Sequence, residues 1–475
     1  MCHRTPLFSI MFMALILCPC FLSAQTKPQK PDQRALDLQY DKLKILHKAE
    51  MQTDTAPEFI SIPSDYPEVK DFDVAKTPPA IDFAIVQGLN PFYLDDSGIY
   101  GGWGAITEGP DGCFYFSIGN HRSYGGTAYM IRYDPAAKSQ KIVIDSQKVC
   151  GWKPNEFGDG KFHGDPDIAP NGDMWLLTFF GPYPTQQEWD SGKYHGGHIV
   201  KFNIFSGKAE DLGIPLEGGS WPYHTWDWER GVLFGVTEVN NYIIAYDTKA
   251  RKTIYGGSPG LNINWYSRAN LIDRETGKIY ATNSVKDQTE GHKIVCWERL
   301  NNKFTIMKSE TPKNPETGKS GALRAYTKRK DADGAFWCFD FYGSMFKFYP
   351  AQDKTEFVGM NWGKTGKYTS NICMSPKGRY LYYIPGADTN AYTYGTPVVQ
   401  YDMKTNRKKV IAFLNDFYLK KYGYSPGGTY GIALDKKGET FFFYMNGKFT
   451  TKEKGSGYGR PSLFHLHIPA EERKE

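Results

Sequence analysis

Residues 429–443, with the sequence TYGIALDKKGETFFF, show the pattern that decides the fold. A short apolar run leads into a turn that contains Gly438, and an aromatic run follows the turn at once. Two such runs joined by a short turn with Gly and Asp are typical of adjacent antiparallel strands. The arrangement recurs at intervals of roughly 45 to 60 residues, with these turn glycines: Gly112, Gly172, Gly231, Gly277, Gly334, Gly378 and Gly438.

A third strand-like run follows each pair and ends in a turn of its own. Examples are YMIRYDP, which ends at Pro135, and IVKFNIFSG, which ends at Gly207. A short fourth run commonly comes next. Units of three or four antiparallel strands at this spacing are typical of β-propeller blades, which bury their faces against their neighbours. The sequence therefore predicts an all-β fold, a seven-bladed β-propeller over residues 81–475, with eight blades as the alternative.

The composition agrees with this fold and excludes several others. Of the 475 residues, 40% are hydrophobic and 15% aromatic, and 49 are Gly. Such a chain is too apolar for disorder and too rich in turn formers for a helical bundle. Lys and Arg exceed Asp and Glu only by 57 to 52, without a basic block, so we expect no nucleic-acid partner. We also expect no transmembrane segment in the mature chain.

The first 80 residues have a different character. Residues 1–24 have a basic start, a short apolar run and a small residue at the end, typical of a secretory signal cleaved after Ala24. A lipoprotein anchor is less favoured, because the cysteines near the end of this segment do not follow small residues. We expect residues 25–80 to form an N-terminal arm with one helix at 32–52 and a proline-rich linker. A signal peptide implies a secreted or periplasmic protein.

Five cysteines remain after removal of the signal peptide. Their odd number, their wide spacing and the lack of a CxxC pair indicate neither a disulfide framework nor a zinc motif. Cys113, Cys296 and Cys338 lie inside strand-like runs, where a thiol behaves as a small apolar group. We expect a packed core, and not disulfides, to stabilise the fold.

The residues that enter the first strand of each blade are the main functional candidates. These strands line the central channel of a propeller, so the residues before them converge on one face. Small or apolar residues would serve a purely structural propeller there. The chain instead has His, Arg and aromatic residues at this position: Trp103, His163, His224, Arg268, Arg324, Tyr368–Thr369 and Thr429–Tyr430. His121, in the loop after the second strand of blade one, is expected at the same face.

A divalent metal is a second kind of ligand that the sequence suggests. His163 and Asp165 are two residues apart, and His195 and His198 lie in a loop expected on the same face. Imidazole and carboxylate groups can share one ion. The spacing matches no dense ligand motif. The sequence is therefore compatible both with a bound divalent metal and with no cofactor.

Each of these residues also has a purely structural interpretation. A His in a propeller loop most often bonds a backbone carbonyl, and an Arg commonly pairs with an acidic group of the next blade. Tyr and Trp fill the space between sheets, and the carboxylates after His163 can satisfy turn amides. The joint occurrence of His, Arg and Tyr at matching blade positions is less easily explained by packing, and it favours a functional rim.

Two resemblances follow from these residues. Stretches such as GGHIVKFNIFSGKAEDLG (196–213) and YIIAYDTKARKTIYGG (242–257) resemble lactonase-like and quinoprotein-like secreted propellers. The rim of His, Arg and Tyr resembles that of propeller polysaccharide lyases of the oligogalacturonate and ulvan lyase types. The chain departs from lactonase-like enzymes, because no Glu stands among the residues listed above at the start of each blade. It departs from quinoprotein dehydrogenases, because their tryptophan motif and paired cysteines are missing.

The lyase resemblance implies a role for each rim residue on an acidic glycan. Arg268 or Arg324 would neutralise the uronate carboxylate. His163 and His224 are the expected base and acid, with Tyr368 and Tyr430 as substitutes. His121, Trp103 and Trp265 would contact the sugar. Two other readings stay open: a non-catalytic propeller that binds glycan or protein, and a metal-dependent hydrolase or lactonase.

Overall fold

The structure is a computed structural model that describes residues 50–474 except 68–69, 87–100, 122–123, 154, 239, 288, 389, 451–454 and 456–457. The chain divides into two compact units, residues 1–42 and 43–475. All of the described residues belong to the second unit. The expected signal peptide lies outside the described residues, as does the expected helix at 32–52 up to residue 49. Gln52, the last residue of that helix, instead begins a strand.

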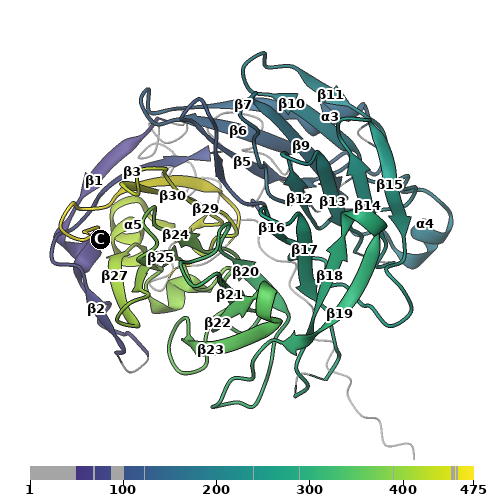
Figure 1. The fold of residues 1–475 in the computed structure, drawn as a ribbon. Helices are drawn as coiled ribbons and strands as arrows, with labels where there is room; N and C mark the ends of the chain where they lie inside the picture. The colour runs from purple at the N-terminus through teal and green to yellow at the C-terminus, as the bar shows by residue number, and fades with distance from the viewer. Residues whose placement is uncertain are drawn as a thin grey trace, which may run out of the picture. The chain divides into compact units, whose positions relative to one another are not determined.

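The described strands form seven small sheets in a ring, a seven-bladed β-propeller (Figure 1). This confirms the predicted fold and the count of seven over eight. Blade one contains β4 (Thr107–Glu108), β5 (Phe114–Gly119), β6 (Ala128–Asp134) and β7 (Ser139–Asp145). Blade two contains β8 (Lys161–Phe162), β9 (Asp173–Phe179), β10 (Ile199–Asn203) and β11 (Ala209–Asp211). Blade three contains β12 (Tyr223–Asp227), β13 (Val232–Val236), β14 (Ile243–Asp247) and β15 (Lys252–Gly257).

The next blades repeat this meander. Blade four contains β16 (Leu271–Asp273), β17 (Lys278–Thr282), β18 (Lys293–Glu298) and β19 (Lys303–Glu310). Blade five contains β20 (Leu323–Tyr326), β21 (Phe336–Asp340), β22 (Ser344–Tyr349) and β23 (Lys354–Met360). Blade six contains β24 (Cys373–Met374), β25 (Tyr380–Tyr383), β26 (Pro397–Asp402) and β27 (Arg407–Phe413), and β2 (Phe72–Val74) adds to β27 in parallel.

Blade seven joins the two ends of the propeller. Its inner strands are β29 (Ile432–Leu434), β30 (Thr440–Met445) and β32 (Ser462–His467), and its outer strands are β3 (Ala80–Ile85) and β1 (Gln52–Thr55). The pairing of β3 with β32 runs from Ala80 opposite His467 to Ile85 opposite Ser462. Strands from residues 52–74 thus extend blades seven and six, within the segment expected as an arm.

The remaining elements are short. The helices are α3 (Ser146–Cys150), α4 (Gln186–Asp190) and α5 (Asn415–Tyr422), with single 3₁₀ turns at Pro57–Ile60, Arg299–Asn301, Pro350–Gln352 and Ala391–Tyr394. Strands β28 (Tyr424–Ser425) and β31 (Lys448–Phe449) form a separate two-stranded sheet. No helix in the described part of the chain is long and apolar enough to cross a bilayer.

The seven turn glycines identified from the sequence all join the first two strands of a blade. Each has a positive φ, between 68° for Gly231 and 83° for Gly172. Residues with a Cβ rarely adopt this backbone conformation, whereas Gly adopts it without strain. The repeat is therefore readable from the sequence because each hairpin needs a glycine at the same place.

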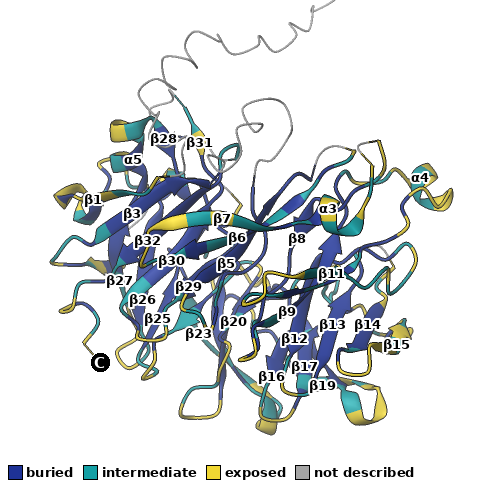
Figure 2. Ribbon diagram, turned by 90° about the horizontal axis from the view of Figure 1, so that it is seen from above, coloured by how far each residue is buried: buried dark blue, intermediate teal, exposed yellow. Residues whose placement is uncertain are grey.

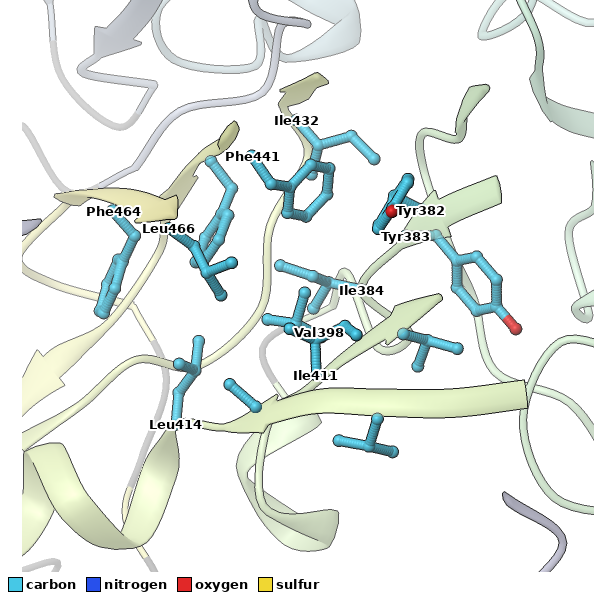
Figure 3. Packing of buried hydrophobic residues seen from close by; sticks show 14 of the residues in the cluster. Tyr382, Tyr383, Ile384, Val398, Ile411, Leu414, Ile432, Phe441, Phe464 and Leu466 are labelled. Atoms are coloured by element: carbon cyan, nitrogen blue, oxygen red, sulfur yellow. The ribbon is translucent and has the colours of Figure 1, made fainter. Parts of the chain in front are cut away.

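Aromatic and branched side chains fill the space between the sheets. Most of each inner strand is accordingly buried (Figure 2). Between blades six and seven, Ile384 and Val398 lie near Phe441 and Leu466 (Figure 3). Each fully buried side chain of this size contributes about 1.5–3 kcal/mol. Cys113, Cys296 and Cys338 are buried, as predicted. A packed core thus accounts for the high aromatic content.

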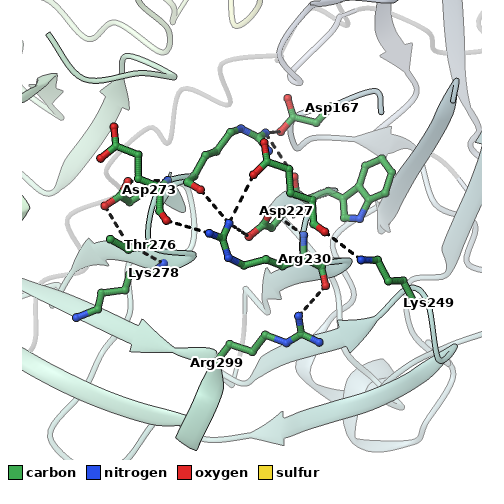
Figure 4. Close-up of polar contacts among 12 residues, drawn as sticks. Asp167, Asp227, Arg230, Lys249, Asp273, Thr276, Lys278 and Arg299 are labelled. Atoms are coloured by element: carbon green, nitrogen blue, oxygen red, sulfur yellow. Dashed lines mark hydrogen bonds and ion pairs between the residues drawn. The ribbon is translucent and has the colours of Figure 1, made fainter. Parts of the chain in front are cut away.

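Polar contacts join blades at the turns between their first two strands. Arg230 donates hydrogen bonds to Asp227, 3.1 Å away, and across to the carbonyls of Arg274 and Glu275 in blade four (Figure 4). The carbonyl of Arg230 accepts a hydrogen bond from Arg299. The bonds from Arg230 attach blade three to the first turn of blade four. Arg274, in that turn of blade four, donates a hydrogen bond of 2.8 Å to Asp167 in blade two.

Candidate functional site

Five of the residues selected from the sequence meet at the mouth of the channel. His163 follows β8, Arg268 precedes β16, Arg324 lies in β20, and Tyr368 and Tyr430 precede β24 and β29. The guanidinium of Arg324 lies 5.1 Å from the ring centre of Tyr368 and 5.8 Å from that of Tyr430. The rings of His163 and Tyr430 are 6.4 Å apart. These five residues are called the channel-mouth cluster below.

Arg324 is the centre of this cluster. It is 3% exposed and donates hydrogen bonds to the Tyr368 hydroxyl and to the carbonyls of Arg268 and Ser370. None of the described carboxylates lies within 4.0 Å of its guanidinium. Burial of a charge without a counter-ion is costly. An anionic ligand at this point would supply the missing charge.

Arg268 is partly neutralised by an acidic residue. Its Nη2 lies 3.1 Å from Oε1 of Glu238, in the loop between β13 and β14. The pKa of Arg268 is raised, since the attraction of Glu238 and of nearby tyrosines outweighs burial, which by itself lowers it. Arg268 is about a quarter exposed, so its guanidinium remains accessible at the channel mouth.

Lys161 adds a third basic side chain that the sequence analysis missed. It lies in β8 two residues before His163, and its ammonium is 4.3 Å from the ring centre of Trp103 and 5.0 Å from that of Phe179. Among the described residues, no carboxylate pairs with it. Burial lowers the pKa of Lys161 well below its usual value, and Arg268 lowers it further. Alternation along β8 is the sequence signal that could have found it, because residues two apart share a face.

His163 is completely buried, and neither ring nitrogen has a hydrogen-bond partner among the described residues. Burial lowers the pKa of His163 well below 6.5, and the charges of Arg268 and Lys161 lower it further. The imidazole is therefore neutral at neutral pH and can accept a proton. An unsatisfied buried imidazole carries a desolvation cost, as expected for a residue kept for a purpose other than packing.

Tyr430 is positioned by an acidic residue from the neighbouring blade. Its hydroxyl donates a hydrogen bond to Oδ1 of Asp388, 2.5 Å away, in the loop between β25 and β26. Burial raises the pKa of Tyr430 well above its usual value, and nearby Tyr458 and Tyr368 raise it further. The phenol thus remains protonated and can serve as a proton donor.

Aromatic residues flank the cluster, but only some of them match the expectation. His121 bonds the carbonyl of Phe180 through Nδ1, and burial lowers its pKa to about 3. Trp103 lies against His121 and is only 7% exposed. The accessible aromatics are ones that the sequence analysis missed. Tyr183 is 55% exposed beside His121, and Phe341 is 38% exposed beside Tyr368.

Two of the selected residues do not reach the mouth. His224 is buried between blades two and three, and a Cβ on Gly164 would lie 2.3 Å from its Nδ1. Trp265 is 2% exposed and packs against Phe234 in the core between blades three and four, so its ring is not accessible at the mouth. The residue next to His224 has the opposite orientation, because Tyr223 lines the channel.

The carboxylates after His163 are paired with cations. Asp165 accepts a hydrogen bond from Tyr223 and lies 3.6 Å from Lys328. Asp167 lies 2.9 Å from Lys328 and also binds Arg274. Ammonium and guanidinium groups therefore already pair with both carboxylates. His195 and His198 line a different cavity, so the four expected metal ligands do not converge.

A cavity of about 410 Å³ continues down the channel from Arg324. Its wall includes Tyr223 and Tyr326, and its charged residues are Asp165, Lys328, Arg329, Glu108 and Lys436. The volume suits a single sugar or another small molecule. The cluster is therefore continuous, through Arg324, with a cavity that is rich in both charge signs.

No family model and no curated protein match the chain. Several solved structures share its fold. A chain of the mitotic checkpoint complex is 9% identical over 87% of this chain and 96% of that chain, with a TM-score of 0.49. A chain of a nidogen–laminin complex is 13% identical over 66% and 96%, with a TM-score of 0.39. The extracellular domain of a one-component system from B. thetaiotaomicron is 12% identical over 84% and 40%, with a TM-score of 0.47. These likenesses concern the fold alone.

Proposed function

We propose that the channel mouth binds the carboxylate of an acidic glycan and cleaves the chain by β-elimination. The observation that carries the proposal is the charge of Arg324, a buried cation without a carboxylate partner among the described residues. A carboxylate bound between Arg324 and Arg268 would complete the charge balance. Nε and Nη1 of Arg324 donate to Tyr368 and to two carbonyls, which leaves Nη2 to donate to the carboxylate.

The elimination needs a base, an acid and a neutralised carboxylate. With the carboxylate held by arginine, C5 of the uronate becomes acidic enough to lose its proton to His163. The electron pair forms the C4–C5 double bond and the C4–O4 bond breaks. Tyr430 or Tyr368 then protonates the departing oxygen. His224 has no role in this elimination, because it lies between sheets and cannot contact a ligand in the channel.

The exposed aromatics fit the same substrate. Tyr183 and Phe341 lie on two sides of the cluster and present accessible rings. Sugar rings pack on such faces through their C–H groups while the hydroxyls stay hydrated. These two residues, and not Trp103 and Trp265, are therefore the proposed stacking platforms. A chain of sugars could extend across the mouth while one uronate enters the channel.

A polymer panel tests the proposal directly. The mature protein is incubated with polygalacturonate, alginate, ulvan and a neutral glucan, and the ultraviolet absorbance of the unsaturated product is followed. Arg324→Ala should reduce turnover about 10²–10³-fold, as when one preorganised transition-state donor is removed. Arg251→Ala is the matched control, because Arg251 forms an exposed ion pair with Glu210 on the outer surface. Unchanged turnover in Arg324→Ala would overturn the assignment.

One observation favours a non-catalytic version of the same site. His163 is 0% exposed, so a bound sugar reaches it only if neighbouring side chains move. If the mouth only binds, acidic glycans should bind the wild-type protein and yield no unsaturated product, and Arg324→Ala should abolish binding. Calorimetry on the polymers that give no product distinguishes this module from the lyase.

A further inference from the structure

A second cavity, of about 780 Å³, lies outside the channel beside blade two. Its wall comprises the end of α3, the segment that follows it and the loop before β10, with Trp152, Phe157 and Ile214 among the lining residues. The proposed function makes no use of this cavity. Two side chains capable of binding a metal, Cys150 and His198, line it, and Asp211 lies against His198.

These three side chains come from three separate elements. Cys150 ends α3, His198 directly precedes β10, and Asp211 ends β11. One ligand atom of each lies within 4.8 Å of the other two. Nδ1 of His198 lies 3.0 Å and 3.1 Å from the two carboxylate oxygens of Asp211. Ligand atoms of a tetrahedral zinc site lie about 3.3–3.7 Å apart, because the bonds are about 2.0–2.3 Å long. Small side-chain shifts therefore suffice to close the site.

We propose that Cys150, His198 and Asp211 bind a zinc ion. Thiolate, imidazole and carboxylate are the ligands that zinc takes in proteins, and this mixed set is too soft for magnesium or calcium. Three protein ligands leave the fourth position of the ion facing the cavity, where a water or a small ligand completes the tetrahedron. The free thiol of Cys150 loses its proton on binding, so its charge and that of Asp211 balance the ion.

A second set of contacts holds the ligands in place. The backbone N–H of His198 donates to the hydroxyl of Thr178, 2.7 Å away, and this hydroxyl donates to Asp159. Asp159 is buried and also accepts a hydrogen bond from Tyr194 at 2.9 Å. Supporting contacts of this kind orient metal ligands and raise affinity.

The other cluster of ligand type among the described residues is less suited. Asp82, His465 and His467 gather on the paired strands β3 and β32 of blade seven. The ammonium of Lys138 already lies 2.7 Å from Oδ1 of Asp82, and Thr53 and His467 donate to the same carboxylate. A divalent ion would have to displace this cation. The Cys150 cluster contains no such competitor in the described part of the chain.

Metal titration of the reduced, chelator-treated protein tests the site. Zinc is titrated against a chromophoric chelator, and cobalt is used as a spectroscopic probe of thiolate ligation. We expect one equivalent of zinc and a thiolate-to-cobalt charge-transfer band. Cys150→Ser should abolish the band, and Cys150→Ser and His198→Gln should each weaken zinc binding at least tenfold. His195→Gln and Cys373→Ser are the controls, since His195 lines the same cavity and Cys373 is another partly buried free thiol.

Circular dichroism and melting curves establish whether each variant is folded. If Cys150→Ser does not fold, His198→Gln still tests the site. Zinc affinity and a cobalt band that persist in both folded variants would overturn the proposal. Absence of saturable zinc binding to the wild-type protein would do the same. Loss of binding only in His467→Gln would place the metal at β3 and β32 of blade seven and also refute it. None of these readouts depends on glycan cleavage.

Discussion

The Nε of Arg324 donates a hydrogen bond to the phenolic oxygen of Tyr368, so a cation from blade five and a phenol from blade six meet at the channel mouth. The same guanidinium also binds the carbonyl of Arg268 from blade four. One side chain therefore joins three blades at the point where a ligand would enter. This arrangement fixes Arg324 before any ligand arrives, which reduces the entropy cost of binding.

Arg324→Lys tests whether geometry matters beyond charge. Lysine keeps the positive charge but cannot bind Tyr368 and a carboxylate in one plane. We expect the KM for the acidic glycan to rise about tenfold and melting temperature to change little. Steady-state kinetics and a melting curve measure both. A KM equal to that of the wild type would show that only charge is needed.

Tyr430→Phe removes the proposed proton donor while retaining the ring. We expect kcat to fall about 10²-fold, with a smaller change in KM, because general acid catalysis contributes about 10²–10⁴-fold. Tyr383→Phe is the control, since the Tyr383 hydroxyl binds the carbonyl of Asn361 inside the fold. Equal losses in the two variants would indicate damage to packing and not loss of an acid.

Buried His224 should make stability depend on pH. Burial lowers its pKa to about 3, whereas the unfolded residue titrates near 6.5. Below pH 6.5 only the unfolded state takes up this proton, so the stabilisation present at higher pH is lost as pH falls toward 3. At pH 5 the expected loss from this residue is about 2 kcal/mol relative to pH 8.

Urea unfolding of wild type and His224→Gln at pH 8 and pH 5 measures this contribution as a difference between the two proteins. The difference is needed because burial raises the pKa of Asp159 and Asp340 to about 6, and these carboxyls act in the opposite direction. The drop in unfolding free energy from pH 8 to pH 5 should be smaller in the variant. An equal drop in both proteins would refute the assignment to His224.

Gly160→Ala should be severely destabilising. A Cβ at this position would lie 1.6 Å from the carbonyl oxygen of Asn120, so the backbones of blades one and two would have to separate. Gly207→Ala is the matched control: its φ is +68°, but a Cβ there meets no atom within 4 Å. We expect a cost of about 1–2 kcal/mol for Gly207→Ala and a much larger one for Gly160→Ala. Comparable melting temperatures would contradict this.

Truncation tests the predicted boundary between arm and propeller. A chain that lacks residues 1–49 keeps every described strand and should unfold in one cooperative transition. A chain that lacks residues 1–86 loses β1, β2 and β3, which exposes the edge of β32 in blade seven and that of β27 in blade six. We expect this chain to aggregate or to melt at a much lower temperature. Light scattering and calorimetry distinguish the outcomes.

The fold could be predicted from the sequence because the turn between the first two strands of each blade requires a glycine at one position. The channel-mouth cluster was partly readable for a similar reason, since its members occupy matching places in different blades. The sequence could not show that His224 and Trp265 lie between sheets, because counting residues gives the position along a strand but not the side on which a side chain lies. A shift of one residue reverses that side, as Tyr223 and His224 show.

Other residues could not be predicted because they come from loops without a fixed spacing. Tyr183, Glu238, Phe341 and Asp388 all lie between the second and third strands of their blades, on loops of different length. The Cys150, His198 and Asp211 cluster is also invisible in the sequence, because blade packing and not a motif brings its members together. Only tertiary contacts reveal such sites.

The pairing of β3 with β32 has a consequence for how the protein is made. Residues 80–85 leave the ribosome long before residues 462–467, yet each strand is the other's partner. Until residues 462–467 are available, the edge of β3 that pairs with β32 has no partner. During that time β3 can pair with a strand of a neighbouring copy. Productive folding therefore depends on the final residues of the chain, and a nascent protein arrested shortly before them would be a target for chaperones and proteases.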